Sequence, residues 1–178
     1  MIPRIGDFQN LLARLETWLA RHRRRFLKGL CPGAASAELA ALEKQLGIAV
    51  PSELRLLLGW HNGQSEDVIG KFEEDWQLMS ATAIATAKQE LDAGAATTGW
   101  QKSWVPFLDN DAGDYVCLDT AIAGVPVRQF WLGKNDHPIV ATSLYVWLQD
   151  FVDHVEQGKY REEPERGTFM LQKRGQDL

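Results

Sequence analysis

The sequence predicts a single α+β domain in which helices near both ends of the chain flank a meander of strands. The chain has 178 residues, which is within the size range of one domain. Apolar residues recur at helical spacing near both ends, and a strand–turn–strand pattern occupies residues 104–119 between them. Seven Trp and seven Phe provide enough apolar surface for a core.

The first part of the chain is predicted to be helical. Residues 7–27 carry apolar side chains at helical spacing. A second helix is expected over 37–46 after the N-cap Ser36, and a third over 52–60, ended by Asn62-Gly63. Basic residues gather near the end of the first helix: Arg21, Arg23, Arg24, Arg25 and Lys28. Because cations are favoured at a helix C-terminus, we interpret this cluster as a solvated helix end in preference to a nucleic-acid or membrane patch.

The middle of the chain alternates between short strands and one helix. A strand is expected over 76–79, a helix over 81–91 after the N-cap Ser80, and a loop of small residues over 94–99. Residues 104–119 then form a β-hairpin with a polar turn containing Gly113. In this hairpin we expect Trp104 to be mostly buried and Asp109 and Asp111 to lie at an exposed turn.

The last part of the chain closes the sheet and returns to helix. Strands are expected over 127–132 and 138–141, and Ser143 is expected to cap a final amphipathic helix that ends at Gly158. Residues 159–178 are charged and are expected to be loosely ordered, although residues 169–171 are apolar enough to dock on the body.

Charge and cysteine content restrict the functional class. The net charge of −5 argues against nucleic acid as the main ligand. The two cysteines, Cys31 and Cys117, form no disulfide framework, which favours a reducing compartment. The N-terminus lacks the pattern of a secretory signal, and no apolar run reaches the length of a membrane helix. We therefore expect a cytoplasmic protein that does not bind membranes.

The residues expected of an enzyme are missing from the sequence. Ser65 lacks the glycine spacing of a nucleophile elbow, and Cys117 lies among apolar residues of a predicted strand. His61, His137 and His154 have no recognisable local partner and are expected at the surface. No glycine-rich nucleotide loop occurs. We predict no catalytic activity and no cofactor.

The turn of the predicted hairpin is its most unusual feature, since it carries Asp109, Asp111 and Asp114. A calcium loop of the EF-hand type needs Gly at its sixth position and Glu at its twelfth. Here Gly113 stands at the fifth position and Thr120 at the twelfth, so the glycine is misplaced and the glutamate that would coordinate calcium is absent. Local hydrogen bonds of Asp in turns explain the cluster without an ion. We therefore predict no metal site.

Two segments of the chain follow a recognisable order of motifs. The first has a Pro-Gly-Ala start, a helix, a Leu-Gly to Val-Pro link, a second helix and a closing Asn-Gly: Pro32–Ala34, Glu38–Glu43, Leu46-Gly47, Val50-Pro51, Glu53–Arg55 and Asn62-Gly63. The second precedes the last apolar helix: Trp104–Phe107, Gly113-Asp114, Leu118-Asp119 and Ala141–Ser143. Together they resemble the SUKH superfamily, whose namesakes include a fungal cell-wall assembly regulator of the Smi/Knr type.

The resemblance implies helices around a central, strongly bent, mainly antiparallel sheet, and no catalytic activity. It spans roughly 32–157, which leaves residues 1–31 as an N-terminal amphipathic helix with a basic end and 158–178 as a charged tail. Bacterial members are commonly immunity proteins that neutralise a cognate toxin enzyme, often a nuclease. Fungal members act as regulatory scaffolds.

The protein is therefore expected to bind another protein, with a bacterial toxin as the first candidate and an endogenous partner of a scaffold as the alternative. A small-molecule-binding or enzymatic domain that uses the carboxylate turn stays open as a third class. Acidic residues would attract a basic partner, and Trp side chains, including Trp100, would act as hot spots if exposed. The candidate binding residues are Asp109, Asp111, Asp114, Trp60, Asn62, Trp76, Glu73 and Glu74.

Overall fold

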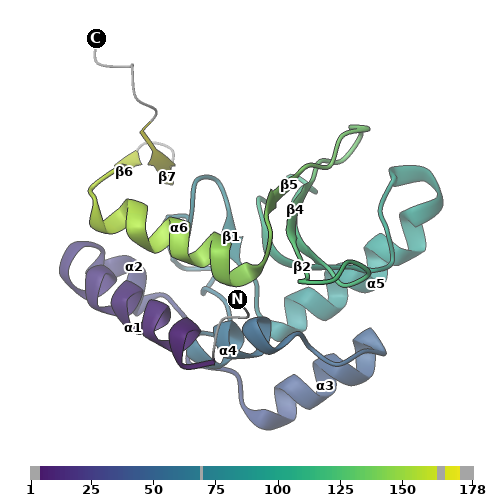
Figure 1. The fold of residues 1–178 in the computed structure, drawn as a ribbon, viewed down its shortest axis with the longest axis horizontal. Helices are drawn as coiled ribbons and strands as arrows, with labels where there is room; N and C mark the ends of the chain where they lie inside the picture. The colour runs from purple at the N-terminus through teal and green to yellow at the C-terminus, as the bar shows by residue number, and fades with distance from the viewer. Residues whose placement is uncertain (1–4, 69, 164–166, 173–178) are drawn as a thin grey trace.

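The computed structural model describes residues 5–68, 70–163 and 167–172, and within them the chain folds as α+β (Figure 1). The helices are α1 (Ile5–His22), α2 (Arg24–Lys28), α3 (Ser36–Leu46), α4 (Ser52–Trp60), α5 (Ala81–Thr98) and α6 (Leu144–Glu156). The strands are β1 (Gln77–Leu78), β2 (Trp104–Asp109), β3 (Tyr115–Asp119), β4 (Val127–Phe130), β5 (Ile139–Ala141), β6 (Tyr160–Glu163) and β7 (Thr168–Leu171).

The main sheet confirms the predicted hairpin. Its strand order is β1-β2-β3-β4-β5 and each neighbouring pair is antiparallel. Trp104 pairs with Asp119 and Asp109 with Tyr115, so the two strands of the hairpin face one another along their whole length. The register shifts between Pro106 and Leu108, and a bulge of this kind bends a strand. Trp104 is 5% exposed, as expected.

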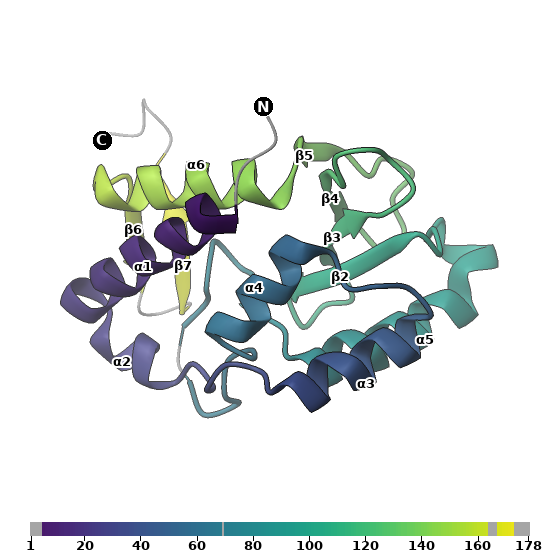
Figure 2. The same ribbon diagram turned by 60° about the horizontal axis from the view of Figure 1, so that its bottom comes forward.

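Helices lie on both sides of this sheet. Helices α1 and α6 run side by side, α3 and α5 form a second pair, and α4 lies between the two pairs (Figure 2). Leu15 of α1, Leu57 of α4 and Leu148 of α6 are fully buried in one apolar core. The N-terminal helix therefore shares the core of the domain.

The first helix is not continuous as predicted, because it breaks at Arg23. This residue has φ −131° and ψ 48°, outside the helical region, and separates α1 from α2. The residue is 5% exposed, although the sequence pattern placed it on a solvated helix end. Arg23 Nε donates to Glu162 and Nη2 donates to the Lys71 carbonyl. Contacts to residues far away in sequence decide the break, so local spacing did not predict it.

The helix predicted over 81–91 is longer than expected, and the predicted loop over 94–99 is wrong. Helix α5 continues to Thr98 because the alanines after Leu91 have high helix propensity. Gly94 is tolerated within the helix, and Gly99 ends it in the left-handed conformation with φ 78°.

The charged tail is more ordered than predicted over its described residues. Strands β6 and β7 pair antiparallel. The Phe169 side chain is 2% exposed, which confirms the predicted docking of 169–171. Glu74 and Phe169 exchange two backbone hydrogen bonds, so β7 is joined to the segment before β1. Residues 164–166 and 173–178 of the predicted tail lie outside the described residues.

Candidate protein-binding surface

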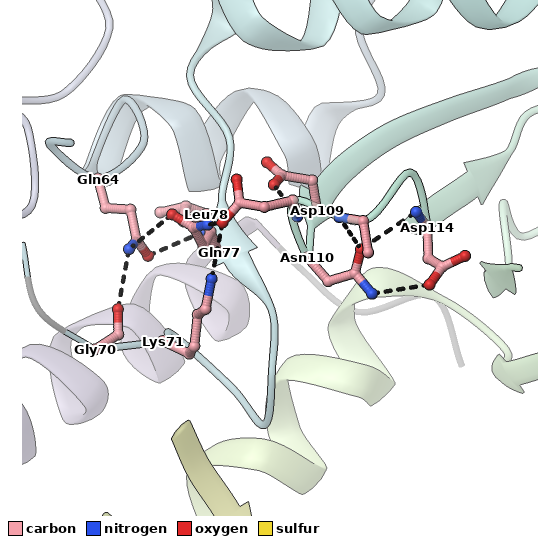
Figure 3. A network of polar contacts seen from close by, with 10 residues as sticks. Gln64, Gly70, Lys71, Gln77, Leu78, Asp109, Asn110 and Asp114 are labelled. Carbon is pink, nitrogen blue, oxygen red and sulfur yellow. Dashed lines mark hydrogen bonds and ion pairs between the residues drawn. The ribbon is translucent and has the colours of Figure 1, made fainter. Parts of the chain in front are cut away.

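Residues 109–114, which are the last residue of β2 and its connection to β3, are here called the acidic turn, and its own side chains hold its shape (Figure 3). Asp109 Oδ1 accepts from the Asp111 backbone N–H at 3.1 Å. Asn110 Oδ1 accepts from the backbone N–H groups of Ala112 and Asp114, and Asn110 Nδ2 donates to Asp114 Oδ2. Such Asx bonds stabilise turns without an ion.

Neighbouring segments fix the acidic turn on two sides. Lys71 Nζ lies 3.0 Å from Asp111 Oδ2, and the Gln77 side chain donates to the same oxygen. On the other side, Asp114 Oδ1 accepts from the Leu132 backbone N–H at 2.8 Å. The carboxylates are therefore held in place before any partner arrives, which lowers the ordering entropy that binding must overcome.

The three aspartates differ in exposure. The Asp111 side chain is 69% exposed, which confirms its predicted position at an exposed turn. Asp109 is half-buried, and this burial raises the pKa of its carboxyl above the usual value. Within residues 5–68, 70–163 and 167–172, no group of three or more His, Cys, Asp or Glu side chains could hold a metal ion.

An apolar side chain lies beside the carboxylates. Leu132 is 50% exposed and follows β4 in the sequence. A Cβ atom added at Gly113 would lie 3.1 Å from Leu132 Cδ2, so the two chain segments are in close contact. The sequence analysis did not select Leu132, because proximity to the turn depends on the pairing of β3 with β4.

Trp76 is not the exposed anchor that we expected. It is 3% exposed and lies 5.5 Å from the Trp131 ring, centroid to centroid. Trp100 is also buried, at 2% exposure. Trp60 is half-buried, donates from Nε1 to Glu16 at 2.9 Å and lines a hollow of about 520 Å³ between α1 and α4. Of the candidate Trp residues, Trp60 alone keeps substantial exposure.

Glu73 and Glu74 have structural partners at the β6–β7 sheet. Tyr160 Oη donates to Glu73 Oε1 at 2.7 Å. Burial raises the pKa of the Glu73 carboxyl to about 7, with a smaller contribution from the charge of Glu74. Glu74 has φ 48° and pairs through its backbone with Phe169. Both residues therefore help to attach the C-terminal strands.

Asn62 also has bonds inside the fold. Its Oδ1 accepts from the Ala81 backbone N–H at 2.7 Å, at the start of α5, and its Nδ2 donates to Glu38 Oε1 at 2.9 Å. These two bonds, one accepted and one donated, explain why an Asn side chain stands at position 62 of the Asn-Gly motif. Gly63 follows with φ 83°, and a Cβ atom there would lie 2.6 Å from the Ser80 backbone nitrogen.

The variant Asn62→Ala is expected to lower the free energy of unfolding by about 1–2 kcal/mol, because it removes a cap of α5 and a bond to α3. Urea denaturation followed by Trp fluorescence measures this change. Glu38→Gln removes the charge of the carboxylate that accepts from Asn62 Nδ2 but leaves the bond between Asn62 Oδ1 and the Ala81 backbone N–H in place, so it should lose less. A loss below about 0.5 kcal/mol for Asn62→Ala would show that neither bond stabilises the fold.

His61 lies beside a cysteine and a glutamate, so its contacts bear on whether it could act as a catalytic base. Its Nδ1 is 2.6 Å from the Cys31 carbonyl oxygen, and its Nε2 is 3.2 Å from Glu16 Oε2. Both ring nitrogens therefore face oxygen acceptors, and neither is available to take a proton from the Cys31 thiol. Cys117 is fully buried, and burial raises the pKa of its thiol.

The fold and this surface define a class of protein: an α+β domain with helices packed around a five-stranded antiparallel sheet and a hydrogen-bonded acidic turn at one end of its central hairpin. A sequence model of the SMI1 / KNR4 family (SUKH-1) matches residues 33–150, more than half of the chain. The chain belongs to this family.

Members of the family are generally non-enzymatic immunity or regulator domains that bind protein partners. A comparison with curated proteins gave no match. Of the helices within the described residues, none is both long enough and apolar enough to cross a membrane.

Proposed function

We propose that this chain is a non-catalytic immunity protein that binds a cognate bacterial toxin enzyme, such as a nuclease, in the cytoplasm and neutralises it. The observation that supports this most is the acidic turn, whose exposed Asp111 is held in place by Lys71 and Gln77. A nuclease that binds phosphate carries basic residues at its active site, and a fixed acidic turn is complementary to them.

The proposed contact surface consists of Asp111, Asp114 and Leu132. The carboxylates would speed the encounter with a basic partner, while Leu132 would be buried in an apolar recess at the centre of the contact. The hydrogen bond between Asp114 and the Leu132 backbone keeps these two kinds of side chain next to one another. Trp60 lines the hollow between α1 and α4 and is a second candidate contact.

A charge variant tests the electrostatic part of the proposal. Asp111→Asn removes one exposed charge, and Asn tolerates the positive φ of 61° at this position. With the protein encoded beside this chain's gene as the partner, we expect association to slow several-fold at low salt and much less at high salt. Surface plasmon resonance across a salt series measures this.

The matched control is Asp150→Asn, which removes an equal charge from the exposed face of α6. Equal slowing by both variants would mean that only the net charge matters, and the acidic turn would then be rejected as the contact. Stoichiometric loss of the partner's enzymatic activity on mixing separates an immunity protein from a scaffold of the regulator type, because a scaffold binds its partner without inhibiting it.

The apolar part of the surface has its own test. Leu132→Ala is expected to weaken binding by about 1–2 kcal/mol, through faster dissociation, because buried apolar area is lost. Ile122→Ala is the control, since Ile122 is 41% exposed but lies in the β3–β4 connection. Unchanged dissociation for Leu132→Ala would place the apolar contact elsewhere, with Trp60 as the next residue to replace.

A further inference from the structure

A second hollow, separate from the acidic turn, lies between α2, residues 65–68 and 70, and the β6–β7 strands. Its volume is about 820 Å³. Arg24, Arg25 and Lys28 line it from α2 and are exposed. Within the described part of the chain, none of the three forms an ion pair with a carboxylate. Three cations that pair with no carboxylate among the described residues therefore line one hollow.

A buried arginine forms the floor of this hollow. The Arg23 guanidinium lies between two aromatic rings, 4.1 Å from the Phe26 centroid and 4.0 Å from the Phe169 centroid. Its Nε bonds Glu162 and its Nη2 bonds the Lys71 carbonyl, but Nη1 is buried with no acceptor among the described residues. Because Glu162 balances its charge, Arg23 contributes to the hollow chiefly through Nη1, a buried donor group without an acceptor among the described residues.

Carboxylates limit the size of the ligand. Asp67, Glu162 and Glu163 also line the hollow, and Glu162 is already paired with Arg23. A long polyanion such as a nucleic-acid backbone would meet these acidic groups, whereas a single small anion can sit among the cations. A phosphate group carries a charge near −2 and three terminal oxygens, so it can accept from several cations at once.

We propose that this hollow binds one phosphate group, either as free phosphate or as a phosphorylated side chain of a protein. Binding is electrostatic and uses the guanidinium and ammonium donors of Arg24, Arg25 and Lys28. The site is independent of the acidic turn, so it does not rest on the proposed function. It would give the protein a response to phosphate or to phosphorylation in addition to partner binding.

Isothermal titration calorimetry with inorganic phosphate, at constant ionic strength, tests the proposal on the full chain. We expect saturable binding, and a loss of affinity of about tenfold or more in the double variant Arg24→Gln/Lys28→Gln. Both side chains are exposed, so circular dichroism should show the fold unchanged. The control Lys44→Gln/Lys134→Gln removes two exposed cations elsewhere and should bind phosphate as the wild type does.

A phosphoserine peptide and the same peptide without phosphate distinguish a phosphorylated side chain from free phosphate as the natural ligand. Tighter binding of the phosphopeptide than of inorganic phosphate assigns the site to a phosphorylated protein, and equal binding assigns it to free phosphate. The proposal is overturned if neither phosphate probe binds, if the unphosphorylated peptide binds equally well, or if the control variant loses as much affinity as Arg24→Gln/Lys28→Gln. Asp111→Asn should leave phosphate binding unchanged, which separates this site from the acidic turn.

Discussion

Replacing Asp119 with Ala is expected to lower the free energy of unfolding by about 3–5 kcal/mol, because it removes the carboxylate of a buried ion pair. Asp119 is 4% exposed. Its Oδ2 accepts from Trp104 Nε1 and from Arg128 Nη2, each at 3.1 Å, and its Oδ1 accepts from the Ser103 hydroxyl at 3.2 Å. Removing this carboxylate leaves the Arg128 charge without a counter-ion.

Arg128 has few other groups to compensate for that loss. Its side chain is 15% exposed, its Nη1 donates to the His137 carbonyl and its Nε has no acceptor among the described residues. Denaturant unfolding followed by Trp fluorescence measures the change. The double variant Asp119→Ala/Arg128→Leu should be more stable than the sum of the two single losses predicts, because no unpaired charge is left. A loss below about 1 kcal/mol for Asp119→Ala would contradict this account.

The same residue illustrates what the sequence could predict. Leu118-Asp119 was singled out as a motif at the end of the hairpin, and the hairpin, its turn and the buried Trp104 are present as expected. These features depend on alternating apolar residues and a Gly-containing turn, which are local patterns. The role of Asp119 as the acceptor for Trp104 and Arg128 depends on the pairing of β3 with both β2 and β4, which no local pattern contains.

The predictions that proved wrong also concern contacts between distant segments of the chain. Trp76 lies next to three acidic residues and was expected to be exposed, but it is buried and its ring packs against that of Trp131, which directly follows β4. Arg23 was expected in a solvated cluster, but Phe26 and Phe169 enclose it. In each case the burial of a residue is decided by a segment more than fifty positions away or by the docking of the C-terminal strands. Helix and strand periodicity does not report such contacts.

In the proposed binding surface too, the sequence predicted a local feature but not the contacts that other segments make with it. The sequence selected the acidic turn from its composition, but Leu132 and Lys71 reach that turn from other segments. Glu73 and Glu74 were selected for their charge, yet their contacts are with Tyr160 and Phe169. Charge along the sequence therefore indicated an acidic region without separating the carboxylates that are available to a partner from those that hold the fold.

The free energy of unfolding of the wild type is expected to fall as pH rises from about 5 to 8, because of Glu73. The variant Glu73→Gln is expected to remove this fall. The pKa of Glu73 is raised from 4.5 to about 7 in the folded protein, chiefly by burial. Between these values the folded state holds the proton more tightly than the unfolded state does, so the free energy of unfolding decreases as pH rises. Because Glu73 is half-buried, we expect a total decrease of roughly 2–3 kcal/mol from this group.

The difference between wild type and variant isolates this contribution, since other titrating groups affect both proteins equally. Gln is uncharged and keeps an oxygen that accepts from Tyr160, so Glu73→Gln should match the wild type near pH 5 and exceed its stability by roughly 2 kcal/mol at pH 8. Denaturant unfolding at a series of pH values gives both curves. Glu66→Gln, at an exposed carboxylate, is the control and should run parallel to the wild type. Parallel curves for Glu73→Gln as well would mean that solvent reaches the carboxylate, and the docking of β6 and β7 would then be insensitive to pH in this range.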